Sequence, residues 1–586
     1  MRIRVVQYGF AALVAGVLVL PLASAGATPS GTLTRVSQAT IVDSIGYQAE
    51  VQPALASAAG SKTLVSAFEV GRAYNGGASA IGWATSVNGG KSFKHGLVPL
   101  TIQAGGSGGI WRGADPSVAY NARYGKWLVE ATGLGSTANT LGLYVSRSDD
   151  GKSWGSPIQV HAAGTGDTPS KSWITCDNYG NSAGYGNCYV AYSNTASTPA
   201  NQLFVSTSTD GGASWSAPAG TPDTSVGTGA IPLVQPTAPS ASPGSTCGRL
   251  VVSYANGAAL NDFASSDCGA TNSAHAVITS TQAAQHTVAQ GLRVSLLPSA
   301  TIDGSGAIYL AYQTRSFRIT QTTLSAAANA GDTNIKVGSV TGMVAGGTLT
   351  VDTGASAETV TITTVGTSGA GGTGVTFTPA LASAHAQGVF VTVNGVASTS
   401  TAAPNDIAMA VMPGPTDATP APSFGSPSRV AIEADNGAST NTVDHFIPAI
   451  AADPSTSGGG AHLALFYYSY PIASCAFITG APLDNTQGAQ CAPEFHYVSS
   501  TNGGTSWSAT QTLASMQSLA VLPRTGPIGT TGNGNPDLGL YSSAAVIPFG
   551  PLAGKAISVF DYGLAANHLD ESMYVPTHGL AIGGGS

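Results

Sequence analysis

Charge is scarce in this chain of 586 residues: Lys, Arg, Asp and Glu together make up 9% of it, and the formal net charge is −8. A partner such as nucleic acid or an anionic membrane requires a basic face, which this balance argues against. Apolar residues at helical spacing are also nearly absent. Alternating runs of Val, Ile, Tyr and Thr lie between Gly, Pro, Asn and Ser instead, which predicts an all-β protein.

Signatures of nucleotide and metal chemistry are missing as well. The chain has no phosphate-binding P-loop and no His-Glu-x-x-His motif. Asp303-Gly-Ser-Gly is similar to a cation-binding loop, but it fits an ordinary hairpin turn better. We therefore predict no metal and no cofactor.

The first 25 residues have the pattern of a secretory signal peptide. Arg2 and Arg4 precede an apolar run over residues 9–22, and Ala23-Ser24-Ala25 follows it, so cleavage is expected after Ala25. A membrane anchor is the alternative, but this run is too short to span a bilayer comfortably. We expect an exported, soluble mature chain.

The six cysteines form three pairs that are close in sequence: Cys176 with Cys188, Cys247 with Cys268, and Cys475 with Cys491. An even count in an exported chain favours disulfides over metal binding, since no Cys-x-x-Cys or neighbouring His pair occurs. Each bridge closes a short loop, which is worth about 3 kcal/mol in the chain-entropy model.

One eight-residue pattern recurs along the chain. It reads Ser-Val-Asn-Gly-Gly-Lys-Ser-Phe at residues 86–93, and close variants of it occupy residues 147–154, 208–215 and 500–507. Asn or Asp followed by Gly closes a tight hairpin, whose polar side chains bond the turn and whose aromatic residue packs it onto its neighbours. Phe93, Trp154 and Trp215 follow one another at the same interval of 61 residues. A period of this length, built from short strands, predicts the blades of a β-propeller.

The pattern resembles the Asp-box, or BNR repeat, of bacterial sialidases, whose consensus is Ser-x-Asp-x-Gly-x-Thr-Trp. Asn replaces Asp at Asn88 and Asn502, Ser replaces Thr throughout, and Arg147 replaces the first Ser. The resemblance implies a propeller in which these turns lie on the rim, away from the catalytic face. Non-catalytic propellers carry the same boxes, so the resemblance indicates architecture more strongly than activity.

Candidate first strands of the blades are apolar segments, most of them led by Pro or Trp. They occupy residues 52–56, 115–119, 172–176, 235–239, 297–301, 447–451 and 540–544. We therefore predict seven blades, with six as the alternative. Residues 33–37 could supply the missing outer strand of the last blade and so remove a free sheet edge.

A stretch rich in Ala, Gly and Thr interrupts the period between the second and third strands of the fifth blade. We predict a signal peptide (1–25), a first part of the propeller (26–318), a small inserted β-domain (319–400) and a second part of the propeller (401–586). The inserted domain either helps to hold a glycan or cell-surface polymer, or acts as a passive spacer.

Chemistry in a propeller is expected where two sets of loops meet on one face: those that enter the first strands and those that join second to third strands. This placement gives a wide set of candidates, which includes Glu69, Lys171, Asp537 and Asp561. From it we predict a narrower site. Its catalytic residues are Asp115, Glu50 and Tyr541, and its substrate-binding residues are Arg72, Arg112, Arg315, Trp111 and Asp444.

The resemblance to sialidases implies three arginines that clamp a carboxylate, an Asp acid/base, and a Tyr nucleophile backed by Glu; a planar guanidinium suits such a clamp. Arg72, Arg112 and Arg315 lie in the right loop classes. The Arg-Ile-Pro motif of that family is absent, however, since the nearest strings are Phe446-Ile-Pro and Leu522-Pro-Arg. This departure argues against cleavage of sialic acid.

Three functions remain open from the sequence. The first is a secreted, monomeric glycoside hydrolase that acts on an extracellular glycan or polysaccharide, as the resemblance implies. The second is a propeller that binds carbohydrate or another surface ligand without catalysis. The third is a polysaccharide lyase, which would need a Tyr or His base beside a charge-neutralising Arg.

Overall fold

A computed structural model of the chain describes residues 33–37, 49–106, 108–257, 259–279, 292–294, 296–314, 319–352, 356–397, 405–430, 432, 443–471, 491–516, 519, 522–523, 536–563 and 571–583. The expected signal peptide, Arg315 and Cys475 lie outside these residues. Within them the fold is all-β: no α-helix occurs, and the short 3-10 turns include η1 (Ile102–Ala104) and η5 (Gly458–Gly460).

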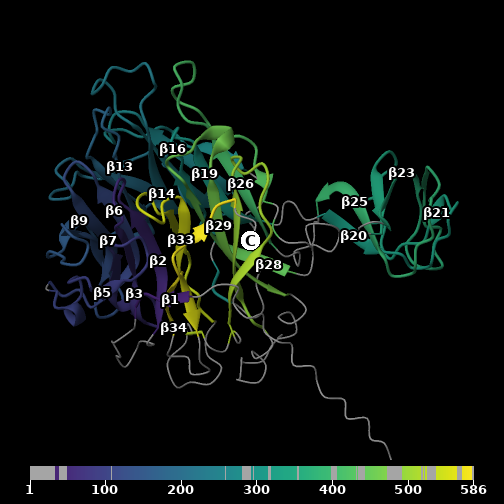
Figure 1. Cartoon of the computed structure of the whole chain (residues 1–586), viewed down its shortest axis with the longest axis horizontal. Coiled ribbons are helices and arrows are strands. Elements are labelled where there is room, and N and C mark those ends of the chain that lie inside the picture. Colours follow the sequence, from purple (N-terminus) through teal and green to yellow (C-terminus); the bar gives the residue numbers. More distant parts are fainter. Residues whose placement is uncertain are drawn as a thin grey trace, which may run out of the picture.

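Most strands belong to four-stranded antiparallel units that follow one another along the chain (Figure 1). The backbone pair Ala78 and Gly113 links the first two units into one sheet. The units are, in order, β2 (Glu50–Ser57), β3 (Leu64–Arg72), β4 (Ala78–Ser86) and β5 (Lys94–Leu97); β6 (Arg112–Asn121), β7 (Lys126–Leu134), β8 (Thr140–Ser148) and β9 (Ile158–Ala162); β10 (Pro169–Cys176), β11 (Cys188–Asn194), β12 (Gln202–Ser208) and β13 (Ala219–Gly220); β14 (Thr228–Gln235), β15 (Arg249–Asn256), β16 (Ala259–Ser265) and β17 (Ala276–Thr279).

Three further units complete the series. They are β18 (Ser299–Ile302), β19 (Ile308–Thr314), β26 (Asp406–Met412) and β27 (Ser428–Arg429); β28 (Val443–Ala452), β29 (Leu463–Pro471), β30 (Glu494–Ser500) and β31 (Gln511–Ser515); and β32 (Ser543–Val546), β33 (Lys555–Gly563) and β34 (Glu571–Pro576) with β1 (Leu33–Arg35), where β35 (Leu580–Ala581) also pairs with β33.

The first strands of these seven units contact one another in chain order, from β2 through β6, β10, β14, β18 and β28 to β32, and β32 contacts β2 again. As predicted, the N-terminal segment pairs with the last unit, since β1 lies antiparallel to β34 with Leu33 opposite Pro576. The hydrophobic clusters lie between neighbouring units, as the cluster of Leu64, Phe68 and Ile557 shows.

Most first strands share a bulge at which one residue has a left-handed backbone. The register shifts there in β2, β6, β10, β14 and β28. The residues with positive φ at these bulges are Gln52, Asp115, Lys171, Gly229 and Ile447. A bulge turns a side chain away from the strand's regular alternation, and a non-glycine residue with positive φ is strained.

The repeated turns have the predicted hydrogen bonds. Oδ1 of Asp210 accepts from the backbone N–H groups of Ala213 and Ser214, at 2.9 Å each, and Gly212 donates to the Ser208 hydroxyl at 2.8 Å. The aromatic residues pack against the hydrophobic clusters between units, as predicted. These residues are Phe93, Trp154, Trp215 and Trp507.

A fifth turn of the same kind, at residues 265–272, was missed by the sequence analysis. The Asp267 carboxylate accepts from the backbone N–H of Thr271 at 2.9 Å, and Gly269 donates to the Ser265 hydroxyl at 3.0 Å. Cys268 stands where the other turns have Gly or Asp, and its φ is 60°. Asn272 stands where they have an aromatic residue, so the pattern is not visible in the sequence.

Two of the predicted disulfides are confirmed. Cys176 is bonded to Cys188 between β10 and β11, and Cys247 is bonded to Cys268, which fixes the fifth turn. Cys491 is also in a disulfide. Its predicted partner, Cys475, lies outside the described residues.

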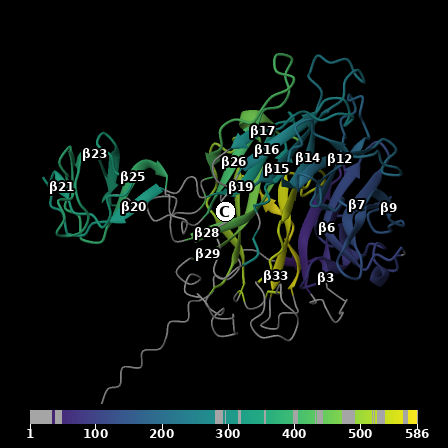
Figure 2. The same ribbon diagram turned by 180° about the vertical axis from the view of Figure 1, so that it is seen from behind.

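One sheet stands apart from the others in both views of the chain (Figures 1 and 2). Its chain lies between β19 and β26, and its strands run in the order β20-β25-β22-β23-β24-β21 around their own hydrophobic cluster. They are β20 (Ile319–Thr323), β21 (Asn334–Ile335), β22 (Thr348–Val351), β23 (Glu358–Val365), β24 (Val375–Thr378) and β25 (Phe390–Ala397).

A buried histidine holds this sheet's last loop in place. Nδ1 of His385 lies 3.0 Å from Asp352 and its Nε2 lies 3.1 Å from Glu358, while the ring itself has no exposed surface. Glu358 also accepts from the backbone N–H groups of Ala382 and Ser383. One imidazole therefore links the ends of two strands to the loop that precedes β25.

The fourth first strand was predicted in the wrong place. We expected it at residues 235–239, but β14 begins at Thr228 and ends at Gln235. Its bulge uses Gly229, not a residue before Pro, so the Pro-led pattern pointed to the segment after the strand. In the part of the chain that the structure describes, no helix has the length and apolarity needed to cross a membrane.

Candidate functional site

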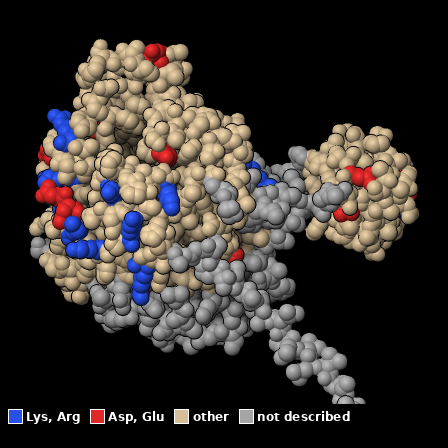
Figure 3. Space-filling model, in the orientation of Figure 1, with Lys and Arg blue, Asp and Glu red and all other residues tan. Residues whose placement is uncertain are grey.

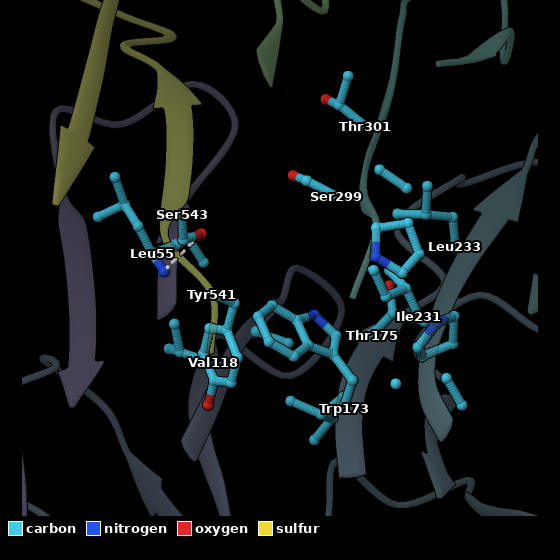
Figure 4. Close-up of a pocket in the computed structure, with 18 of the residues that line it drawn as sticks. Leu55, Val118, Trp173, Thr175, Ile231, Leu233, Ser299, Thr301, Tyr541 and Ser543 are labelled. Carbon is cyan, nitrogen blue, oxygen red and sulfur yellow. Dashed lines mark hydrogen bonds between the residues drawn. The ribbon is translucent and has the colours of Figure 1, made fainter. Parts of the chain in front are cut away.

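A cavity of about 260 Å³ lies where the first strands meet (Figure 4). All seven units contribute to its lining. One representative from each is Leu55, Val118, Trp173, Ile231, Thr301, Ile450 and Ala544. Most of the lining is apolar or carries hydroxyl groups, and among the described residues its only charged members are Asp115 and Lys171. A concave pocket that combines apolar side chains with convergent polar groups is the usual form of a small-molecule site.

Asp115 and Lys171 form an ion pair at this cavity. The Lys171 ammonium donates to Oδ1 of Asp115, and the Lys171 backbone N–H donates to Oδ2 at 3.2 Å. Burial opposes ionisation of Asp115, but the charge and hydrogen bonds of Lys171 outweigh it and hold the pKa of the carboxyl below its usual range. Asp115 is therefore a carboxylate at neutral pH.

Two aromatic rings stand beside this pair. Trp173 and Tyr541 meet edge to face, with their centroids 5.1 Å apart, and both line the cavity (Figure 4). The Tyr541 hydroxyl donates to the backbone carbonyl of Pro116 at 2.9 Å, which ties it to the residue after Asp115. Burial, reinforced by the nearby Asp115 carboxylate, raises the pKa of Tyr541 well above its ordinary value, so the phenol stays protonated.

A buried ionic network adjoins Asp115. Glu69 accepts from the Asp115 backbone N–H at 3.3 Å and lies 3.5 Å from the Arg72 guanidinium. Arg72 also contacts Asp537 at 3.1 Å, and Arg293 contacts the same Asp537 oxygen at 3.0 Å. Burial raises the pKa of Glu69, with Arg72 offsetting this in part. For Asp537 the two arginines outweigh burial and lower the pKa.

Glu130 joins the bulges that carry Asp115 and Lys171. Its two oxygens accept from the hydroxyls of Ser117 at 2.9 Å and Ser172 at 2.6 Å, and each serine lies one or two residues after a strained position. Burial raises the pKa of Glu130 to about 8, although these hydrogen bonds lower it. Glu130 does not line the cavity, so its role there is to position its neighbours.

Of the predicted residues, the structure brings Asp115, Tyr541 and Arg72 together at or beside the cavity. Arg112 lies outside this network: its guanidinium donates to the side chain of Asn75 at 2.7 Å and to the Gly76 carbonyl at 3.3 Å. Trp111 is 48% exposed next to it. Neither residue lines the cavity.

The other predicted residues lie elsewhere. Glu50 is buried and accepts from the Ser37 hydroxyl and from the backbone N–H of Met573 at 3.2 Å, which ties β2 to the last unit. Asp444 is buried in β28, where it accepts from Asn405 at 2.8 Å and Tyr470 at 2.9 Å. Arg315 lies outside the described residues.

A second acidic pair is buried between the last unit and the first. Asp561 and Glu571 have no exposed surface, and among the described residues neither oxygen of Glu571 has a hydrogen-bond partner. Burial raises the pKa of both carboxyls well above their ordinary values, and the charges of neighbouring carboxylates, Glu50 among them, raise them further. Ionisation of both groups is therefore disfavoured.

Arg293 is the residue of the network that sequence reasoning missed entirely. It lies between β17 and β18, where its backbone N–H bonds to Pro536 at 2.9 Å, and no strand or turn pattern marks that segment. Glu69, Lys171 and Asp537 were in the wide set of loop candidates, and their charge in a chain poor in charge was the available signal. Across the described ranges, no group of three His, Cys, Asp or Glu side chains is arranged to hold a metal ion.

No protein-family model matches the chain, and no curated protein matches it. Among solved structures, a protein of unknown function from Dyadobacter fermentans aligns with 62% of this chain and 99% of its own, at 16% identity and a TM-score of 0.33. The GH93 α-L-arabinofuranosidase of Fusarium graminearum aligns with 79% of this chain and 92% of its own, at 10% identity and 0.34. The Hadza microbial sialidase Hz136 aligns with 47% of this chain and 56% of its own, at 16% identity and a TM-score of 0.30. Likenesses this weak assign no activity to the chain.

Proposed function

We propose that the chain is a secreted, monomeric, seven-bladed β-propeller that hydrolyses glycosidic bonds of extracellular glycans at its central cavity. The seven units whose first strands contact in turn, and all line one cavity, support this architecture. The disulfides support an oxidising, extracellular location. The sheet of β20–β25 belongs to the proposal as a separate inserted domain over residues 319–400.

The observation that carries the activity is the environment of Asp115. Glycoside hydrolysis needs two carboxyl groups of opposite protonation, one acid and one base or nucleophile. Lys171 holds the pKa of Asp115 below its usual range at the cavity, whereas burial raises the pKa of its neighbour Glu69. Carboxyls whose pKa values are pushed apart in this way suit the two roles. In this proposal Asp115 is the base or nucleophile and Glu69 is the proton donor.

The rest of the cavity supports binding of a sugar ring. The C–H face of a sugar is apolar and packs on aromatic rings, which Trp173 and Tyr541 supply. Hydroxyl groups of Ser299, Thr301 and Thr175 line other walls and are suited to bond the ring's hydroxyls (Figure 4). Tyr541, protonated and bonded to Pro116, acts here as a contact for the sugar and not as a nucleophile.

Release of reducing ends from sialylated, pectic and arabinan glycans tests the proposal. We expect Asp115→Asn and Glu69→Gln each to lower the rate on the cleaved glycan by about 100-fold or more, as removal of an acid or base does. Asp149→Asn is the matched control, because Asp149 also pairs with a lysine, Lys126, but on the exposed surface. Unchanged rates in both site variants would contradict the assignment.

Glycan binding without hydrolysis is the second candidate. It is favoured by the position of Glu69, which is buried and does not line the cavity, so that a proton would have to pass beside Asp115 to reach a glycosidic oxygen. Binding of a glycan that the wild-type protein never cleaves, and that Trp173→Ala abolishes, would select this function.

A further inference from the structure

We infer that the cavity accepts an uncharged sugar unit and discriminates against one that carries a carboxylate. This inference rests on the proposed function, since it takes the cavity to be the glycan site. It runs against the expectation of a three-arginine clamp, and it follows from where the cationic side chains point and what already occupies them.

Arg72 is fully engaged within the protein. Its guanidinium bonds Asp537, approaches Glu69, and donates to the backbone carbonyls of Ala73 at 3.1 Å and Gly77 at 2.7 Å. Only 3% of its surface is exposed. A ligand carboxylate would have to displace Asp537 from a buried ion pair with Arg72, and breaking a buried pair is strongly unfavourable.

The other predicted arginines offer no clamp among the described residues. Arg112 bonds Asn75 and Gly76 and does not line the cavity. Arg293 and Arg72 both form ion pairs with the carboxylate of Asp537. Lys171, the single cation among the described residues of the cavity lining, is paired with Asp115 through its ammonium group.

The field around the pair is also unsuited to an anion. Asp115 lies beside the carboxyl groups of Glu69 and Glu130, and the charge of Asp115 contributes to the raised pKa of both. A ligand carboxylate next to Lys171 would therefore face the ionised Asp115 carboxylate directly. Like charges brought together in a site act against the wrong ligand.

The remaining walls favour a neutral ring. Beyond Asp115 and Lys171 the described lining consists mainly of aromatic, aliphatic and hydroxyl side chains (Figure 4), together with the Asn178 amide and Cys176. Such groups form hydrogen bonds with sugar hydroxyls and pack against the C–H faces of the ring. They do not compensate an ionised carboxylate for the hydration that it loses on binding. An arabinose, galactose or xylose unit matches this lining, whereas a uronate or sialate unit does not.

Calorimetric titration of the full chain with two probe series tests the inference. The neutral series is arabinan, galactan and xylan trisaccharides, and the acidic series is trigalacturonate and sialyllactose. We expect at least one neutral probe to bind at least tenfold more tightly than either acidic probe. Tighter binding of an acidic probe, or no binding of any neutral probe, would overturn the inference.

The Asp115→Asn variant sharpens the test, because it frees the Lys171 ammonium. We expect this variant to bind trigalacturonate at least threefold more tightly than the wild type does, while Asp149→Asn, which frees surface Lys126, leaves that affinity unchanged. An unchanged affinity in Asp115→Asn would overturn the role given to this pair. Neutral probes that bind but are never cleaved would refute the hydrolase and leave the selectivity standing.

Discussion

Asp115 and Lys171 occupy the same bulge position on the neighbouring strands β6 and β10, each with a φ of 51°, and their side chains meet in an ion pair across the boundary between two units. Left-handed backbone is costly for residues with a side chain and tends to persist only where the surroundings fix it. Here the pair, and Glu130 behind it, fix both positions at the cavity.

Loss of the ammonium should shift the acid limb of the activity. Lys171 holds the pKa of Asp115 low, so in Lys171→Met that pKa rises and Asp115 becomes protonated at a higher pH. We expect the acid limb of kcat/KM to move upward by about one pH unit, which a pH profile on the cleaved glycan measures. Lys126→Met should leave the profile in place. An acid limb that does not move would show that Asp115 is not the group that titrates.

Glu130→Gln should change how stability depends on pH. The Glu130 carboxyl has an ordinary pKa of 4.5 and a folded pKa of about 8, so between these values the folded protein holds a proton that the unfolded chain has released. The free energy of unfolding therefore falls as pH rises through this window, and the loss is complete above pH 8. Gln does not titrate, so the free energy of unfolding of Glu130→Gln should gain about 5 kcal/mol relative to wild type as pH rises from 4.5 to 8. Denaturant unfolding at several pH values measures this free energy for both proteins. A difference between wild type and Glu130→Gln that stays constant with pH would contradict the prediction.

The pair Asp561 and Glu571 should limit stability in the same direction. Both folded pKa values are raised, so their stabilising contribution is whole below their ordinary pKa values and is lost as pH rises. We expect the double variant Asp561→Asn, Glu571→Gln to melt at a higher temperature than wild type at pH 7, with a gain of about 1–4 kcal/mol. Near pH 3.5 the wild type and the double variant should have the same stability. Calorimetry at both pH values measures the difference.

Asp267→Ala should cost as much as Asp210→Ala. Each carboxylate bonds a backbone N–H group and a side-chain hydroxyl of its own turn, so each variant should lose about 1–2 kcal/mol of unfolding free energy. Asp149→Ala, in an exposed position, should lose much less. A neutral effect of Asp267→Ala would show that the fifth turn is held by its disulfide alone.

His385→Ala should loosen only the inserted sheet. The substitution removes both carboxylate contacts that hold the loop before β25. Hydrogen exchange should quicken within residues 319–397 and stay unchanged in the seven four-stranded units, since the inserted sheet has its own hydrophobic cluster. Substitution of the exposed His95 serves as the control. Faster exchange throughout the chain would contradict an independent core.

The all-β fold and its repeated turns were predictable because Asn-Gly and Asp-Gly turns act locally and mark their own positions. The fifth turn was not predictable. Its hydrogen bonds are the same as in the other turns, but Cys268 and Asn272 replace the residues by which the sequence pattern is recognised. The position of β14 was predicted wrongly for a similar reason. Gly229 has the positive φ at its bulge, whereas in β2 and β6 the residue with positive φ precedes a Pro.

The candidate site was predictable only in part. Asp115, Arg72 and Tyr541 were found because the loop classes of a repeated unit fix where a residue lies along its strand. The partner of each side chain depends on contacts between units, which no local pattern records. For that reason Arg72 was expected to face a ligand and instead faces Asp537, and Arg293 was not found at all.

The pairing of β1 with β34 places the two ends of the described chain in one sheet. These partners are more than five hundred residues apart in the chain, so the sheet of the last unit stays incomplete until β34 has been synthesised. Deletion of residues 33–35 would leave the outer edge of β34 without its partner and ready to recruit a strand from another molecule.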